Sequence, residues 1–94
     1  MSRVYVKPLE GTPVTSIWCG IDHVLGWFVQ VFEGEDRDPV IDIPDRLSAI
    51  CGMNRTKVVQ IIDRYGDSED PRNKKIRDYL IMDLDPAEVD REYA

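Results

Sequence analysis

The sequence predicts an α+β domain, in which an antiparallel sheet of three to four strands (N-terminal half) packs against two to three helices (C-terminal half). Before residue 44, β-branched and aromatic residues alternate with polar ones, which is typical of strands. After residue 45, apolar residues recur every three or four positions, which is typical of amphipathic helices. Strands that precede helices, rather than alternating with them, favour an antiparallel sheet with a helical layer on one face.

The N-terminal half contains up to four strand patterns. Residues 3–7 (RVYVK) alternate polar and apolar side chains as an edge strand would, until Pro8 ends the pattern. Residues 14–21 form the next strand, and residues 27–33 (WFVQVFE) give the strongest strand pattern in the chain. Aromatic side chains fall on both faces of residues 27–33, so we expect this strand to be central or covered on both sides. Residues 39–43 (PVIDI) are long enough for one more antiparallel strand.

The segment from Arg46 to Gly66 predicts two helices that are separated by a break at Gly52. The second of them carries an apolar stripe at positions i, i+3, i+4 and i+7, formed by Val58, Ile61, Ile62 and Tyr65. Asn54 is its expected N-cap, and Gly66 is expected to end it in a left-handed conformation.

Two further helix starts follow in the sequence. Asp70 and Pro71 combine an N-cap with a first-turn proline and predict a third helix. Asp85 and Pro86 repeat this signal near the C-terminus, where residues 86–94 are expected to form a short helix or a frayed tail. Residues 1–94 therefore form a single domain in this interpretation.

The composition indicates a globular protein with a modest core. The chain has 94 residues, of which 43% are hydrophobic and 32% charged, which is too apolar for wholesale disorder. A core of this size makes a homodimer unsurprising. No signal peptide is visible, and no apolar run approaches the ~18 residues that span a bilayer. Two cysteines do not make a disulfide framework, so we expect a cytoplasmic protein with free thiols and no membrane contact.

The charge pattern leaves DNA binding as an alternative function. The net charge of −6 opposes general affinity for nucleic acids, but residues 46–82 hold eight basic and five acidic side chains. If Gly52 marks the turn of a helix-turn-helix, the second helix would enter the major groove. Its contacts would come from Asn54, Arg55, Thr56, Lys57, Gln60 and Arg64. Val59 and Ile62 widen the apolar side of this helix, which leaves less polar surface for a groove.

Neither a metal site nor a catalytic site is predicted. Cys19, His23 and Cys51 are the candidate soft ligands, and a closed zinc site needs four ligands. No nucleophile elbow, phosphate-binding loop or metal-hydrolase motif occurs in the sequence. We therefore expect no catalytic residues, no cofactor and no enzymatic activity.

The leading functional hypothesis comes from the aromatic residues of the strands. Trp18, Trp27, Phe28 and Phe32 fall within fifteen residues of one another. If helices cover one face of the sheet only, part of this set must be exposed or must contact a partner. Adjacent strand residues point to opposite faces, so Trp27 and Phe28 cannot both enter one core. We predict a small protein-interaction or regulatory module that uses these four residues to bind a protein, or a second copy in a homodimer.

Overall fold

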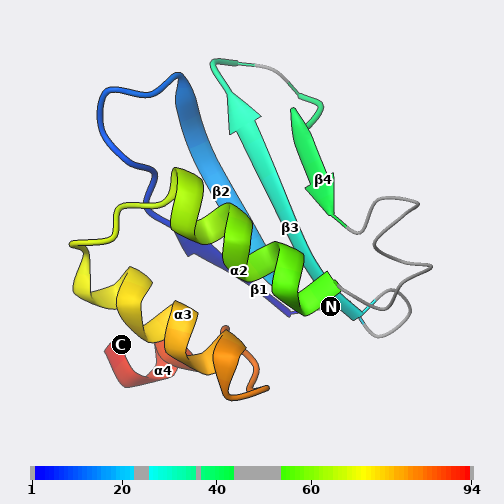
Figure 1. The fold of residues 1–94 in the computed structure, drawn as a ribbon, viewed down its shortest axis with the longest axis vertical. Coiled ribbons are helices and arrows are strands. Elements are labelled where there is room, and N and C mark those ends of the chain that lie inside the picture. Colours follow the sequence, from blue (N-terminus) through cyan, green and yellow to red (C-terminus); the bar gives the residue numbers. More distant parts are fainter. Residues whose placement is uncertain (1, 23–25, 36, 44–53, 94) are drawn as a thin grey trace.

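The computed structural model describes residues 2–22, 26–35, 37–43 and 54–93, and it confirms the α+β fold. Four strands come first in the chain, β1 (Ser2–Val6), β2 (Val14–Asp22), β3 (Gly26–Glu33) and β4 (Ile41–Ile43). They form one antiparallel sheet in the order β1-β2-β3-β4 (Figure 1). Three helices follow among the described residues, α2 (Asn54–Tyr65), α3 (Pro71–Ile81) and α4 (Glu88–Tyr93). The helix expected ahead of Gly52, and the break at Gly52 itself, lie outside the described residues.

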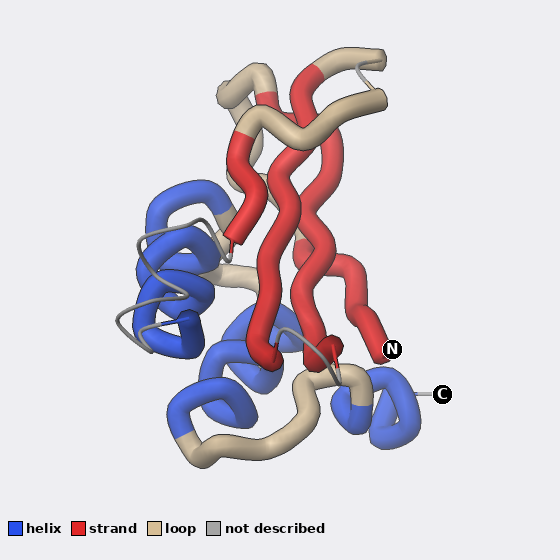
Figure 2. Tube along the Cα trace, turned by 90° about the vertical axis from the view of Figure 1, so that its right-hand side faces the viewer, coloured by secondary structure: helices blue, strands red, loops and turns tan. Residues whose placement is uncertain are grey.

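Helices α2 and α3 form a second layer on one side of the sheet, and α4 lies at its lower end. Figure 2 shows α2 against one face of the sheet, with α3 and α4 closing its lower end. In the described chain, α2 contacts β3 and β4, α3 contacts α2 and β1, and α4 contacts α3. No described segment crosses the opposite face of the sheet (Figure 2). In the described ranges, the structure therefore has two layers, with one sheet face covered by helices and the other without a described segment over it.

The core lies between the sheet and the helices. Val29 and Val31 of β3 point toward the helices, as do their cross-strand partners Cys19 and Ile17 in β2. The buried cluster of this layer consists of Val4, Val6, Val14, Ile17, Cys19, Val29, Val31, Ile43, Val58, Ile62, Ile76, Leu80 and Val89. Every strand and every described helix contributes to it, so the core joins all the elements into one domain.

Gly66 ends α2, as the sequence predicts, but the expected left-handed conformation is wrong. The positive-φ glycines of the described chain are Gly11, Gly26 and Gly34. A Cβ atom on Gly66 would lie 2.8 Å from the carbonyl oxygen of Ile62 and 3.2 Å from Cγ1 of Val6. Glycine is needed here because a Cβ atom would meet the last turn of α2 and the side chain of Val6 in β1, and not because the turn requires a positive φ.

The side chain of Asn73 joins the end of β1 to the loop between α2 and α3. Asn73 is 3% exposed, and it is the polar residue that is buried in the part of the chain that the structure describes. Its Oδ1 accepts a hydrogen bond from the backbone N–H of Lys7 (3.0 Å). Its Nδ2 donates to the carbonyl oxygens of Lys7 (2.8 Å) and Asp67 (3.0 Å). Beside it, the backbone N–H of Asp67 donates to Lys7 (2.9 Å) and that of Leu9 to Tyr65 (2.9 Å).

Two side chains at the start of α3, those of Arg72 and Asn73, lie along the outer edge of β1. Asp70 caps this helix as predicted, because its Oδ1 accepts a hydrogen bond from the backbone N–H of Asn73 (3.0 Å). Arg72, one residue earlier than Asn73, donates to the carbonyl oxygen of Tyr5 and to the carboxylate of Asp90 in α4. The edge of β1 is thereby occupied by side chains, which is one way in which proteins prevent edge-to-edge pairing.

We expect Asn73→Asp to lower the free energy of unfolding by on the order of 3 kcal/mol, since a buried group without its hydrogen bonds is costly. The substitution keeps the shape of the side chain but replaces the Nδ2 donor with an oxygen facing the carbonyl oxygens of Lys7 and Asp67. Urea unfolding at pH 7, followed by circular dichroism, measures the change.

Gln60→Glu is the matched control, because it makes the same amide-to-carboxylate change on the exposed side of α2. It should alter the free energy of unfolding by less than about 0.5 kcal/mol. Equal effects of the two substitutions would show that the donor of Asn73 does not hold β1 against α3.

Candidate functional site

The uncovered side of the sheet, which we call the open face, is built by alternate residues of all four strands. Its central row runs straight across the sheet through Tyr5, Trp18, Gln30 and Asp42, which are successive cross-strand partners. A second row consists of Arg3, Gly20 and Phe28, and a third of Ser16 and Phe32. Four aromatic side chains therefore occupy one surface, and a charged side chain stands at each edge.

Two aromatic rings and one guanidinium group form a defined cluster on the open face. The ring centres of Tyr5 and Trp18 are 5.5 Å apart, and their planes meet at 64°, an edge-to-face arrangement. The guanidinium carbon of Arg3 lies 4.7 Å from the centre of the Trp18 ring, within the range of a cation–π contact. These contacts fix the orientation of Trp18, so a partner would meet an ordered apolar surface.

The residues of the open face differ in how much of their surface is exposed. Tyr5, Trp18 and Phe32 are half-buried, whereas Phe28 is 6% exposed and lies beside Gly20, which has no side chain. Arg3 and Asp42 are exposed, and neither forms an ion pair within the described ranges. The surface thus has aromatic side chains and Gln30 at its centre and, at its edges, two charges that form no ion pair with a described residue.

The structure brings three of the four predicted contact residues together. Trp18, Phe28 and Phe32 share the open face, whereas Trp27 lies on the opposite face and packs against the core cluster. Sequence reasoning missed Tyr5 and Arg3. The alternation in β1 places both on one face, but only the pairing of β1 with β2 shows that this face also carries Trp18.

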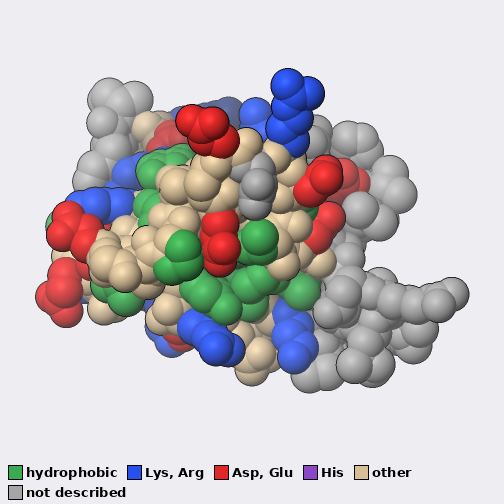
Figure 3. Space-filling model, turned by 90° about the horizontal axis from the view of Figure 1, so that it is seen from above, with side chains coloured by type: hydrophobic (Ala, Val, Ile, Leu, Met, Phe, Trp, Pro, Cys, Tyr) green, Lys and Arg blue, Asp and Glu red, His purple; other side chains and the backbone are tan. Residues whose placement is uncertain are grey.

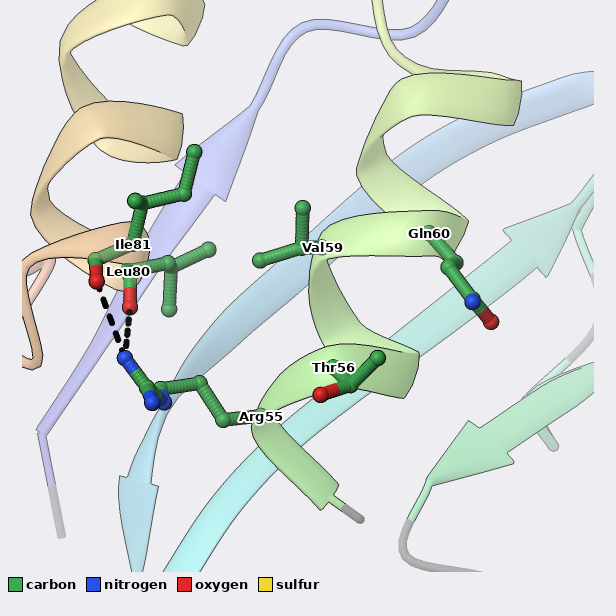
Figure 4. A pocket seen from close by; sticks show the side chains of 6 residues that line it. All are labelled: Arg55, Thr56, Val59, Gln60, Leu80 and Ile81. Carbon is green, nitrogen blue, oxygen red and sulfur yellow. Dashed lines mark hydrogen bonds between the residues drawn. The ribbon is translucent and has the colours of Figure 1, made fainter.

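A groove of about 270 Å³ between α2 and α3 is the second candidate site (Figure 4). Val59 and Leu80 face each other across it, and Gln60 points away from α3. Nη1 of Arg55 donates to the carbonyl oxygens of Leu80 (3.1 Å) and Ile81 (2.9 Å). Arg55 therefore satisfies the C-terminal carbonyl groups of α3, which indicates a structural role for the charged side chain of this groove.

The end of α3 also accounts for part of the apolar surface near the groove. Asp83 has a positive φ of 63°, and the backbone N–H of Leu84 donates back to Tyr79 (2.8 Å). This reversal closes the last turn of the helix and leaves Ile81, Met82 and Leu84 exposed at 49%, 56% and 46%.

The residues of the DNA-binding alternative have different surroundings. Thr56, Gln60 and Arg64 are exposed on α2, and the guanidinium carbon of Arg64 lies 5.4 Å from the ring centre of Tyr65. Lys57 is half-buried, and Arg55 is bound to the end of α3 as described above. Asn54 begins α2. The preceding helix that this alternative needs lies outside the described residues.

Charges of both signs are mixed on the surface. Figure 3 shows one end of the molecule, where acidic and basic side chains stand around a hydrophobic patch and neither sign forms a continuous field. Two ion pairs join helices to one another, Arg77 with Asp63 (2.6 Å) and Arg72 with Asp90. Part of the basic charge in residues 46–82 is therefore neutralised within the domain, because Asp63 pairs with Arg77 and Asp90 pairs with Arg72.

The one cysteine that the structure describes is Cys19, a free thiol in the core. Burial raises the pKa of the Cys19 thiol to about 12, with a smaller lowering effect of Arg72 and a raising effect of Asp85. A thiol in this state is a weak nucleophile and a poor metal ligand. Cys51 and His23 lie outside the described ranges, and the residues within them contain no group of three or more side chains suited to holding a metal ion.

None of the described helices is long and apolar enough to cross a membrane. Comparison with known proteins found no matching family model, no similar curated protein and no similar solved structure. Function is therefore inferred from the chain's own residues.

We expect Cys19→Ala to destabilise the protein by about 1 kcal/mol at pH 7, a usual cost for a small core truncation, and by less at alkaline pH. The folded state keeps the thiol protonated up to a pKa of about 12, whereas the unfolded thiol ionises near pH 9. The stability of the parent protein should therefore fall as the pH rises from 9 toward 12, because the unfolded state binds fewer protons there.

Urea unfolding of both proteins at several pH values between 7 and 11 tests this expectation, because the two proteins differ in the Cys19 thiol alone. Cys51 and all lysines and tyrosines are present in both proteins, so their titration cancels in the difference. A difference in stability that stays constant with pH would contradict burial of the Cys19 thiol.

Proposed function

We propose that this chain is a small, non-catalytic protein-interaction module and that the open face is its contact surface. The observation that carries this proposal is the one-sided covering of the sheet. The described helices pack on one face, while Tyr5, Trp18 and Phe32 remain half-buried on the other (Figure 2). Apolar surface that stays in contact with water is a feature of protein-binding sites.

The chemistry of the open face favours a protein over a nucleic acid. Tryptophan, tyrosine and arginine are the side chains that most often dominate binding at protein interfaces, and here Trp18 contacts both Tyr5 and Arg3. A surface that stacks nucleic-acid bases also needs a positive groove along the phosphates. Here Arg3 is the cation of the three rows and Asp42 is an anion, in a chain with a net charge of −6.

The outer edge of β1 is a weaker candidate than the face. A partner strand would have to pair with backbone groups of β1, but Arg72 already donates to the carbonyl oxygen of Tyr5. Both backbone groups of Lys7 are bonded to Asn73. Strand addition at this edge would have to displace these contacts, whereas binding on the open face would leave them in place.

Two features support the absence of catalysis and a cytoplasmic setting within this proposal. The Cys19 thiol is buried with a raised pKa, so it is not an activated nucleophile. It is also unpaired, as is usual in a reducing compartment. DNA binding through α2 remains the alternative proposal, although the bonds of Arg55 to the end of α3 leave that side chain less free to reach a base.

Site-specific photocrosslinking in the native host cells tests the proposed surface. A photoreactive phenylalanine analogue is placed at Gln30, in the central row of the open face, or at Gln60, on the exposed side of α2. We expect a protein adduct from position 30 and none from position 60. Trp18→Ala should reduce the yield by about tenfold, which is the effect of losing a contact worth about 1.4 kcal/mol.

The control variant is Lys74→Arg on α3, a conservative change at an exposed position on the helical side of the domain, which should leave the yield unchanged. An absence of protein adducts at position 30 would contradict the proposal. A nucleic-acid adduct at position 60 that disappears with Lys57→Glu would instead favour the DNA-binding alternative.

A further inference from the structure

We infer that the open face binds a second copy of this chain, in a face-to-face dimer whose two-fold axis runs along the strands. This inference rests on the proposed function, because it names the occupant of the same surface. An isologous interface requires one surface that is complementary to itself. The arrangement of residues on the open face meets this requirement in both shape and charge.

Shape is the first argument. An axis parallel to the strands, midway between β2 and β3, keeps each cross-strand row in place and exchanges β2 with β3. Cross-strand partners within one chain then face each other between the two copies, so Phe32 lies over Ser16 of the second copy, a large side chain over a small one. In the central row, Trp18 lies over Gln30 of the second copy. Gly20 and Phe28 are buried within each chain, so the contact comes from these two rows.

Charge is the second argument. Arg3 stands on β1 and Asp42 on β4, at opposite edges of the sheet, and the axis along the strands exchanges these edges. The guanidinium group of Arg3 lies over the ring of Trp18, and Trp18 is in the same cross-strand row as Asp42. In the dimer it therefore approaches Asp42 of the second copy, which it can reach across sheets packed about 10 Å apart.

The alternative two-fold axis is disfavoured by the same charges. An axis that runs across the strands through the central row would place β1 over β1 and Arg3 near Arg3 of the second copy. Like charges that face each other in an interface are repulsive and suppress that arrangement. The positions of Arg3 and Asp42 thus select one orientation of the second copy.

The size of the face predicts a weak and reversible dimer. Four strands about 4.8 Å apart and about five residues of ~3.4 Å each give a face of roughly 19 by 17 Å. This is well below the roughly 800 Å² per partner of a standard stable interface. The dimer should therefore form in a concentration-dependent way, with a dissociation constant in the micromolar range or weaker.

Sedimentation velocity of the full chain, from about 10 µM to about 1 mM, tests the inference, since this range covers a weak interface. The parent protein should shift from monomer to dimer. Arg3→Asp and Asp42→Arg should each raise the dissociation constant at least about tenfold, because each places two like charges together. Both positions are exposed, and unchanged thermal unfolding shows that the variants fold.

An equimolar mixture of the two variants is the decisive sample. The first variant is acidic at both positions and the second is basic at both, so their mixed dimer has two opposite-charge pairs. It should form with a dissociation constant within about threefold of the parent value, as should the dimer of the double variant, since both restore the pairing. A parent dimer that responds to neither substitution, or a mixture that does not recover, would overturn the inference.

A parent protein that stays monomeric throughout this range would also overturn it. The crosslink at position 30 then separates this failure from that of the proposed function. An adduct with a different protein would leave the proposed function standing without the homodimer, and the lack of any adduct would remove both.

Discussion

The carboxamide of Asn73 connects the sheet to the helical layer through three hydrogen bonds, one accepted from and one donated to Lys7 and one donated to Asp67. A buried amide can remain in a core only if its polar atoms are bonded, so its geometry fixes the position of α3 relative to β1. The close approach of Gly66 to Val6 depends on the same junction. So does Arg72, which extends from α3 to Tyr5 and to α4.

This junction also decides which surface of the sheet is available. The contacts of α3 hold β1 in a register that sends Val4 and Val6 into the core and Arg3 and Tyr5 to the open face. A slip of one residue would exchange these two sets. Because Arg72 and Asn73 occupy the outer edge of β1, this side of the domain offers an aromatic face and not an unpaired strand edge.

The sequence was sufficient for the elements whose signals are local. The alternation in residues 27–33 predicted β3 and its two faces, and Asp70 with Pro71 predicted the start of α3. The role of Asn73 could not be predicted, because its partner Lys7 is 66 positions away and a helical asparagine carries no local sign of burial. Gly66 was predicted as a helix end for the wrong reason, since glycine is required there by crowding from the Ile62 carbonyl group and from Val6 on a distant strand, and not by a positive φ.

The candidate site was accessible from the sequence only in part, for a related reason. Strand alternation separated Trp27 from Phe28, but it did not indicate which of the two faces the helices would cover. That choice depends on the packing of α2 against the valines of β3, a long-range property. The contribution of β1 to the open face required the register that pairs Tyr5 with Trp18.

The long separation between Lys7 and Asn73 has a consequence for synthesis on the ribosome. At about 5–20 residues per second, roughly 3–13 s pass between translation of the two residues. The strands of the sheet are complete well before α3 exists, so the nascent chain exposes an aromatic face and an unprotected β1 edge during this interval. The acidic side chains at the end of β3 and after it, among them Glu33, Glu35 and Asp38, give this early intermediate a negative charge of its own. Repulsion between neighbouring nascent chains would then keep the unfinished sheet from pairing with another until α3 covers its edge.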